Sequence, residues 1–238
     1  MSALPWLRTK VFADGADVAG IRRLADDPLI RGFTTNPTLM RAAGVTDYER
    51  FAREALACSE GRPISFEVVA DDFGEMERQA ARIAGWGERV YVKIPITDTC
   101  GASSAALLGR MVARGVKVNV TALLTLDQVR TAVACLAGGP HAFISVFAGR
   151  IADSGRDPLP VMREAVELLA PHPNLELVWA SPREVLNVVQ ANEVGCHVIT
   201  LTHDLLAKLP LIGRDLADFS LATVRMFHQD ARAAGYAL

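Results

Sequence analysis

Short hydrophobic runs rich in β-branched and aromatic residues recur along the whole chain. Eight of them are expected to form strands, at residues 9–14, 32–36, 64–69, 90–96, 117–124, 142–149, 175–181 and 197–202. Both faces of these runs are mostly apolar, which is typical of parallel strands that helices cover on the outside. The pattern therefore predicts an α/β fold around a buried parallel sheet.

Segments with helical periodicity lie between these runs, and most of them close on glycine, a usual helix stop. Examples are residues 71–87, 102–115, 125–139, 157–171 and 181–195. The strand centres are spaced by roughly 22 to 32 residues, close to the repeat of a (β/α)8 barrel of about 250 residues. We expect residues 1–238 to form a single-domain (β/α)8 TIM barrel with C-terminal helices over about residues 205–238. A doubly wound sheet is the alternative.

Composition narrows the class of protein without deciding its function. The chain has 238 residues, 50% hydrophobic and 22% charged, with a formal net charge of -2, so we expect a compact soluble protein. No basic cluster favours nucleic acid, and no apolar run approaches the roughly 20 residues of a membrane-spanning helix. The N-terminal segment lacks the apolar stretch of a secretory signal, so we expect a cytoplasmic protein.

Cysteine and histidine spacing gives little support to a metal site or a disulfide framework. The four cysteines show no C-x-x-C spacing, and the five histidines include no H-E-x-x-H pair. We therefore expect reduced thiols, no metal and no cofactor.

Polar side chains interrupt the apolar runs near their carboxyl ends. Seven predicted strands carry one each, in chain order Asp14, Asn36, Glu67, Lys93, Thr121, Ser145 and Ser181. The carboxyl ends of barrel strands share one mouth, where the catalytic residues of barrel enzymes lie. A single satisfied polar group would fit a structural role, whereas seven at one mouth favour an active site.

Lys93 lies in an otherwise apolar run, residues 89–97. Burial costs an ammonium group several kcal/mol, roughly, unless a partner compensates. Burial also favours the neutral amine, which can attack a ketone and form a Schiff base that accepts the electrons of a breaking carbon–carbon bond. A structural lysine paired with Glu67 or Asp14 explains the position equally well at this stage.

The two carboxylates also suit such chemistry. Asp14 could take the proton of a substrate hydroxyl as the bond breaks, and Glu67 could move protons through a water during imine formation and hydrolysis. An acid at a strand end is also a frequent cap of the next helix, and Asp14, which precedes Gly15, fits that role too.

Five motifs together resemble the transaldolase family, in particular its short-chain members. They are GFTTNPTLM at residues 32–40, VKIPIT at 92–97, NVTALLT at 119–125, ISVFAGRI at 144–151 and WASPR at 179–183. The similarity runs from about Val11 to Gly195. It implies a class I, metal-independent enzyme on a (β/α)8 barrel, with its Schiff-base lysine on the fourth strand and small-molecule sugar phosphates as partners.

The resemblance also implies a role for each matching residue. Lys93 would form the Schiff base, and Asp14 would accept and return the proton of bond cleavage. Glu67 and Thr121 would position the water of the imine chemistry. The residues expected to hold hydroxyls of the dihydroxyacetone unit are Asn36, Asn119 and Ser145. Thr34 is counted with the substrate-binding residues, although it chiefly shapes the turn before Asn36 together with Thr35.

Three further residues match the phosphate site of the family, namely Arg150, Ser181 and Arg183. Two guanidinium groups and a hydroxyl make a good receptor for a tetrahedral oxyanion. Surface salt bridges are the alternative for the two arginines. A sulfonated sugar would suit the same anion site.

Two positions bear on the type of reaction, because the family divides into transaldolases and aldolases. Aldolase-type members resemble this chain but carry tyrosine in place of Phe147 and glutamine in place of Glu67. The hydroxyl of that tyrosine could assist the proton transfers that release the enamine as free ketone. Phenylalanine has no hydroxyl, so the enamine is expected to wait for an aldehyde acceptor.

The resemblance therefore implies the transfer of a dihydroxyacetone unit in the pentose phosphate pathway. A reaction of this type converts sedoheptulose 7-phosphate and glyceraldehyde 3-phosphate into erythrose 4-phosphate and fructose 6-phosphate. The alternatives are a fructose-6-phosphate or dihydroxyacetone aldolase and a transaldolase for another sugar. A barrel kept only as a binding scaffold is the non-enzymatic alternative.

The C-terminal segment carries apolar residues at helical spacing, including Leu221, Val224 and Phe227. They are expected to pack over the barrel or against another subunit. Short-chain transaldolases resemble one another in forming ring-like assemblies, so the resemblance implies a homo-oligomer.

Overall fold

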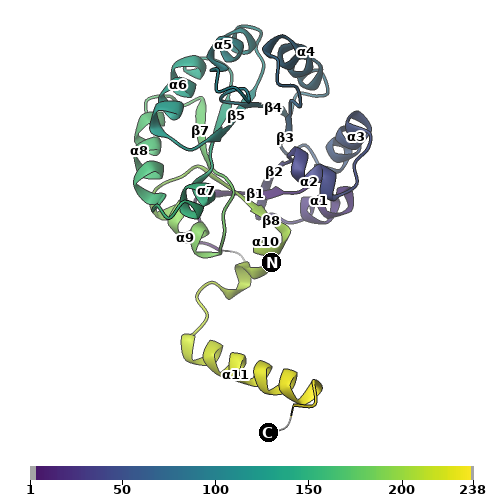
Figure 1. The fold of residues 1–238 in the computed structure, drawn as a ribbon, viewed down its shortest axis with the longest axis vertical. Helices are drawn as coiled ribbons and strands as arrows, with labels where there is room; N and C mark the ends of the chain where they lie inside the picture. Colours follow the sequence, from purple (N-terminus) through teal and green to yellow (C-terminus); the bar gives the residue numbers. More distant parts are fainter. Residues whose placement is uncertain (1–3, 237–238) are drawn as a thin grey trace.

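The structure of the protein is a computed structural model that describes residues 4–236. Eight parallel strands follow one another around a closed barrel (Figure 1). They are β1 (Lys10–Asp14), β2 (Ile30–Thr34), β3 (Ile64–Glu67), β4 (Val90–Pro95), β5 (Val118–Leu123), β6 (Ala142–Val146), β7 (Leu175–Trp179) and β8 (Val198–Thr202). Because β1 pairs with β8 as well as with β2, the sheet closes on itself. The expected TIM barrel is confirmed, and closure excludes the doubly wound alternative.

Helices surround the barrel and connect its strands (Figure 1). They are α1 (Val18–Ala25), α2 (Pro37–Ala42), α3 (Tyr48–Cys58), α4 (Phe73–Ala84), α5 (Ala105–Ala113), α6 (Leu126–Leu136), α7 (Ala148–Asp153), α8 (Leu159–Leu169), α9 (Leu186–Glu193) and α10 (His203–Lys208). A 3-10 turn, η1 (Leu209–Leu211), and the long helix α11 (Leu216–Ala233) follow. The five predicted helical segments contain α4, α5, α6, α8 and α9, which confirms them.

Polar side chains at the strand-to-helix turns start several helices. Asp17 accepts hydrogen bonds from the backbone N–H groups of Ala19 and Gly20, and Asn36 accepts one from Leu39 N at 2.9 Å. Such caps satisfy backbone donors that have no partner inside the helix. Asp17, and not Asp14, is therefore the cap of α1, which leaves the Asp14 carboxylate available at the end of β1.

The alternation of side chains along each strand separates two apolar clusters. Outward-facing residues such as Val92 and Ile94 pack against the helices in the larger cluster. Inward-facing residues fill the lower part of the barrel in a smaller cluster, which consists of Phe12, Tyr91, Phe143, Val178, Ala180 and Val198. On β1, β4, β6 and β8 the next inward positions are polar, namely Asp14, Lys93, Ser145 and Thr200, so this part of the barrel changes from an apolar floor to a polar mouth.

The C-terminal helix α11 projects away from the barrel (Figure 1). None of its residues is buried, and its exposed apolar side chains include Leu216, Val224 and Phe227. The expected C-terminal helical tail is therefore present, but it does not pack over the barrel. Within residues 4–236, no helix combines the length and the apolar character needed to cross a membrane.

Candidate active site

The polar mouth of the barrel is built from inward positions of neighbouring strands. Glu67 on β3 is the register partner of Lys93 on β4, which is in turn the partner of Asn119 on β5. Asp14 ends β1, beside Thr34 of β2. Because side chains alternate between the two faces of a strand, these residues point into the same space. The structure thus brings together predicted residues that lie far apart in the sequence.

Lys93 is held among polar partners inside the barrel. Its side chain is 7% exposed, and Nζ lies 3.0 Å from Glu67 Oε2. Nζ also donates a hydrogen bond of 2.9 Å to the backbone carbonyl of Thr35. The carboxylate and the carbonyl offset the cost of removing an amine from water. The pairing with Glu67 fits a structural lysine and also supplies the proton acceptor that a nucleophilic amine needs.

The surroundings of Asp14 act on the pKa of its carboxyl in opposite directions. Burial raises the pKa of its carboxyl, and the nearby Glu67 raises it further. The charge of Lys93 and a hydrogen bond from Thr34 act in the opposite direction, but burial outweighs them. Thr34 Oγ1 donates this bond at 2.8 Å and is also in contact with Thr200 Oγ1 on β8. A carboxyl whose pKa is raised takes up a proton more readily than an ordinary aspartate, which suits a group that must accept and return one.

A chain of hydrogen bonds lines the opposite wall. Ser145 donates to Asn119 Oδ1 at 2.7 Å, and Asn119 Nδ2 donates to Ser65 Oγ at 3.0 Å. The hydroxyl of Thr121 is buried and has no hydrogen-bond partner among the described residues. A buried hydroxyl without a partner is costly, so Thr121 presents an open position for a polar ligand or a water.

The turn after β2 carries Thr35 and Asn36, and both side chains form hydrogen bonds with backbone groups. Asn36 lies two residues beyond β2, and its Oδ1 caps α2 by accepting a hydrogen bond from Leu39 N. The structure therefore gives Asn36 a cap role in addition to its place at the mouth. Thr35 is fully buried and donates its hydroxyl to Ser65 O at 2.9 Å, which fixes the carbonyl that Lys93 uses.

The predicted anion-binding residues lie on α7, which carries Arg150, and on the β7–α9 connection, which carries Ser181 and Arg183. A Cβ on Gly149 would lie 1.6 Å from the Ser181 carbonyl oxygen, so only glycine allows the first turn of α7 and the β7–α9 connection to approach this closely. Ser181 has a positive φ of 58°, an uncommon conformation for a residue with a side chain. The close approach brings the helix of Arg150 and the connection that carries Arg183 together.

The two arginines have different partners. Arg183 forms a bidentate pair with Asp153, at 2.9 Å for Nε to Oδ1 and 2.5 Å for the second nitrogen. Arg150 is exposed, and its guanidinium carbon lies 5.9 Å from the ring centroid of Phe147. The ion-pair alternative considered for the arginines thus holds for Arg183. An anion bound by Arg183 would share the guanidinium with Asp153.

Several residues at the mouth were not singled out in the sequence. Ser65 and Thr200 hydrogen-bond to predicted residues, and both stand at inward strand positions, so alternation counted from Glu67 and Thr202 would have indicated them. Trp179 is fully buried in the outer cluster, so it packs against the helices rather than into the mouth. His203 directly follows β8 as the first residue of α10.

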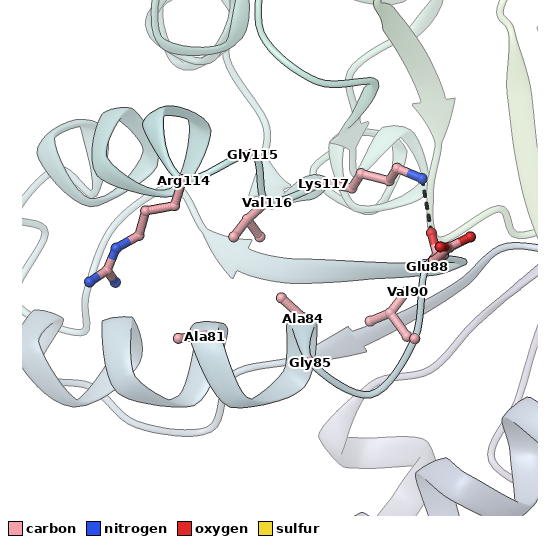
Figure 2. A pocket seen from close by; sticks show the side chains of 10 residues that line it. Ala81, Ala84, Gly85, Glu88, Val90, Arg114, Gly115, Val116 and Lys117 are labelled. Atoms are coloured by element: carbon pink, nitrogen blue, oxygen red, sulfur yellow. Dashed lines mark hydrogen bonds between the residues drawn. The ribbon is translucent and has the colours of Figure 1, made fainter.

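A surface pocket of about 610 Å³ lies at the other end of the barrel. Figure 2 shows its lining between α4 and the start of β5, with Arg114 and Lys117 on opposite sides. Lys117 Nζ donates a hydrogen bond of 2.9 Å to the Glu88 carbonyl. The pocket contains none of the predicted site residues. Among residues 4–236, no group of three or more His, Cys, Asp and Glu side chains is arranged to hold a metal ion.

Comparison with known proteins identifies the family. The sequence model of the transaldolase/fructose-6-phosphate aldolase family matches residues 11–237. The chain belongs to this family. A "Probable transaldolase" of Thermoanaerobacter sp. is 32% identical over 227 residues, covering 95% of this chain and 98% of that protein. Another, of Dehalococcoides mccartyi, is 30% identical over 214 residues, covering 88% of this chain and 95% of that protein. The resemblance of this chain to the transaldolase family is confirmed.

Solved structures of low sequence identity share the fold with this transaldolase-family chain. The structure of 2,3-dimethylmalate lyase has a TM-score of 0.56 at 13% identity, covering 96% of this chain and 84% of that one. Dihydrodipicolinate synthase from Rhodopseudomonas palustris has a TM-score of 0.54 at 14% identity, covering 81% and 69%. At such identities the likeness supports the barrel fold alone.

Proposed function

We propose that this member of the family is a transaldolase that transfers a dihydroxyacetone unit from a ketose phosphate to an aldose phosphate through a Schiff base on Lys93. The observation that carries the proposal is the position of the Lys93 amine. It is buried at the barrel mouth, 3.0 Å from a carboxylate that can take its proton. The raised pKa of Asp14 on the neighbouring side of the mouth supplies the second acid–base group.

The first half of the reaction uses both carboxylates. Transfer of one proton from Lys93 to Glu67 releases a neutral amine, which attacks the donor ketone and forms an imine as one water leaves. Asp14 then removes the proton of the hydroxyl on the carbon that will become the aldehyde. The carbon–carbon bond breaks, its electron pair moves into the imine to form an enamine, and the aldehyde departs.

The second half reverses these steps with another aldehyde. The enamine carbon attacks the acceptor, and Asp14 returns its proton to the new hydroxyl. A water held by Glu67 and Thr121 hydrolyses the imine and regenerates Lys93. The unpartnered Thr121 hydroxyl supports this role. Asn119 and Ser145, already linked by a hydrogen bond, are placed to hold hydroxyls of the retained unit. The reaction needs no metal ion, because the imine is the electron sink.

The proposed mechanism is tested by trapping the imine. The chain has four lysines, Lys10, Lys93, Lys117 and Lys208. Borohydride added with a ketose phosphate donor should attach the donor fragment to Lys93, so trypsin no longer cuts there and the modified peptide spans residues 90–110. A label on another lysine, or none with any donor, would refute the mechanism. A binding scaffold would give no label.

The substrates are tested by product analysis. The protein is incubated with a panel of ketose phosphates and sulfonates, each with and without an aldose phosphate, and products are identified by mass. Transfer that requires the acceptor supports a transaldolase. Release of free dihydroxyacetone without an acceptor would identify an aldolase instead, and a preference for sulfonates would change the donor class.

The residue at position 147 is expected to control whether the dihydroxyacetone unit is transferred or released. Phe147 lies at the mouth as the residue before α7 and offers no hydroxyl for protonating the enamine. We expect Phe147→Tyr to raise the ratio of free dihydroxyacetone to transfer product, because the added hydroxyl offers a proton path. Phe147→Leu is the matched control, with no proton to give. An unchanged ratio in Phe147→Tyr would show that this residue does not control the partition.

We also propose that the protein is a homo-oligomer and that α11 packs on a second copy. Exposed apolar residues lie along this segment, namely Leu216, Phe219, Leu221, Val224, Met226, Phe227 and Tyr236. Most of the stability of a helix in a protein comes from packing of its apolar face, so the 18-residue helix α11 needs a surface to cover it. Light scattering after size exclusion should show several copies, and Val224→Asp with Phe227→Asp should reduce the mass. A monomeric wild type would refute this proposal.

We place the enzyme in the cytoplasm. Its four cysteines are all unpaired in the structure, which suits a reducing compartment. Fractionation of cells that express the protein would test this placement.

A further inference from the structure

The side chain of Tyr48 reaches from the outer helices to the end of β3. Tyr48 is the first residue of α3, and its hydroxyl donates a hydrogen bond of 2.8 Å to the backbone carbonyl of Glu67, the last residue of β3. The carboxylate of the same Glu67 lies 3.0 Å from Lys93 Nζ. A helix outside the barrel therefore holds the backbone of a residue whose side chain acts at the mouth.

The pairing of β2 with β3 explains why this carbonyl takes its donor from another element. Backbone N–H groups of alternate residues along β2 donate to carbonyls of alternate residues along β3, namely Phe33 to Pro63 at 2.8 Å and Thr35 to Ser65 at 3.2 Å. The Glu67 carbonyl is the next in this series, but the residue opposite it in sequence order is Pro37, which has no N–H. The Tyr48 hydroxyl supplies the donor that the strand pairing lacks.

The peptide group between Glu67 and Val68 is held on both sides. Its carbonyl accepts from Tyr48, and its N–H, which belongs to Val68, donates to the backbone carbonyl of Lys93 at 3.0 Å. A peptide group is planar, so two hydrogen bonds at opposite ends fix its orientation. Without the bond from Tyr48, only the bond to β4 would hold this end of β3.

The ring of Tyr48 is itself fixed by aromatic neighbours. Its centroid lies 6.3 Å from that of Phe66 and 5.6 Å from that of Trp86, and both pairs are edge-to-face, the arrangement that aromatic rings favour. Phe66 directly precedes Glu67, so the ring packs on the strand that its hydroxyl holds. Burial raises the pKa of the Tyr48 hydroxyl above its ordinary value, so the group stays protonated and donates at neutral pH.

We propose that Tyr48 is a positioning residue that holds Glu67 at the distance from Lys93 that imine formation and hydrolysis require. The proposal rests on the proposed function, in which Glu67 takes the proton of Lys93 and holds a water. A group that moves protons must stay within hydrogen-bond reach of its partner. Tyr48 acts on the imine steps through Glu67, and it does not touch the substrate.

The central test follows the carbonyl oxygen of the donor ketone in Tyr48→Phe, which keeps the ring and loses only the hydroxyl. Imine formation releases this oxygen as water, and hydrolysis takes a new one from the solvent. A ketose phosphate labelled with ¹⁸O at its carbonyl therefore loses the label at the rate of the imine steps. We expect this rate, corrected for exchange without protein, to fall about 10-fold, because a partly buried carbonyl loses its donor and Glu67 is less well placed. An unchanged rate would overturn the proposal.

Tyr91→Phe is the matched control. Tyr91 lies on the barrel floor, two residues before Lys93 on β4, and its hydroxyl lies 2.9 Å from His141 Nδ1. This variant also removes the hydrogen bond of one tyrosine, but it should leave the loss of label unchanged. An equal fall in both variants would show that the barrel is weakened in general, and would overturn the proposal.

The kinetics of transfer give a second readout of the same variant. Tyr48→Phe should lower kcat and leave KM for the phosphorylated acceptor unchanged, because the predicted anion-binding residues lie on α7 and the β7–α9 connection. A raised KM with an unchanged kcat would contradict a role in the imine steps.

A measurement without turnover separates this proposal from the proposed function. Hydrogen exchange of backbone amides is followed by NMR in the resting protein. In Tyr48→Phe the Val68 amide should exchange about 10-fold faster than in wild type, because its peptide group opens more readily. The amide of Ile96, which donates to Thr121 O at 3.0 Å, should exchange at the same rate in both proteins.

The two measurements fail independently. Faster exchange at Val68 supports the hold of Tyr48 on Glu67 even if no sugar is turned over. Equal exchange at Val68 overturns it even if the enzyme is an active transaldolase. Absence of label loss in the wild type with every ketose donor would refute the Schiff base of the proposed function instead.

Discussion

Each end of the barrel carries a lysine–glutamate pair, and the two pairs differ in their surroundings. At the base, Lys10 Nζ lies 2.5 Å from Glu176 Oε1, and His141 Nε2 lies 3.6 Å from the same oxygen. At the mouth, Lys93 Nζ lies 3.0 Å from Glu67 Oε2. The Lys10 side chain is 44% exposed, whereas the Lys93 side chain is 7% exposed. Water therefore reaches the basal ammonium, but hardly reaches the one at the mouth.

The carboxyl groups of the two ends respond to burial in opposite ways. Burial raises the pKa of Glu176, but the nearby His141 ring and the hydrogen bond from Lys10 outweigh it and lower the pKa to about 2. At the mouth, burial of Asp14 outweighs the charge of Lys93 and the hydrogen bond from Thr34, so its pKa is raised. The basal carboxylate is thus fixed in one charge state and serves structure. The carboxyl at the mouth can change its charge state, as catalysis requires.

The largest effect that separates the two ends is expected from exchanging each lysine for methionine. Lys93→Met should abolish turnover and leave the fold intact, because methionine fills a similar apolar volume without the amine. Lys10→Met should leave turnover unchanged and lower the free energy of unfolding by about 1 kcal/mol, since it removes one partner of a half-exposed pair. Urea unfolding and transfer assays on both variants check this. Residual turnover in Lys93→Met would contradict the assignment of Lys93.

A second effect is expected at the rim of the mouth. Losing the charge-assisted bond of Arg183, about 1.5–3 kcal/mol, should raise KM for a phosphorylated acceptor by about 10- to 100-fold. Remote binding also aligns the substrate, so kcat should fall to a smaller degree. The measurement compares Arg183→Ala on glyceraldehyde 3-phosphate and on glyceraldehyde.

The outcome depends on whether Arg183 binds the phosphate of the acceptor or only pairs with Asp153. A loss confined to the phosphorylated acceptor supports an anion site. An equal loss on both acceptors would show that the pair with Asp153 serves only to hold α7 and the β7–α9 connection together. Asp153→Asn is the matched control, because it frees Arg183 without removing its charge and should not raise KM for the phosphorylated acceptor.

The smallest effect concerns stability against pH at the base. Because folding lowers the pKa of Glu176 from 4.5 to about 2, the ionised group contributes stability that is present above pH 4.5 and is lost as the pH falls through about 2. We expect Glu176→Gln to lower the free energy of unfolding by about 2 kcal/mol at pH 7, and to lose this difference towards pH 2. Chemical unfolding of both proteins between pH 2 and 7 measures this. A difference independent of pH would show that the carboxylate charge is not its source.

The base also shows the limits of prediction from sequence. Lys10, His141 and Glu176 are separated by more than a hundred residues between the first and the last, and no motif joins them. Their contact arises only when β1, β6 and β7 are arranged around one barrel. At the mouth, in contrast, Lys93 and Glu67 were predicted from strand position and motif, because polar residues at the ends of apolar runs stand out in the sequence.

The sequence by itself determined the local elements and the inward direction of the site residues. Short, nearly continuous apolar runs define the strands, and the alternation of side chains between the two faces of a strand decides that Asp14, Glu67 and Lys93 point to the same side of their strands. Only the tertiary structure decided which groups meet. Closure of the sheet sets β8 beside β1, so Thr200 contacts Thr34, and His203 packs on Gly15. The contact of α7 with the β7–α9 connection likewise pairs Arg183 with Asp153. Such pairings depend on distances across the barrel, which local propensity and spacing along the chain do not encode.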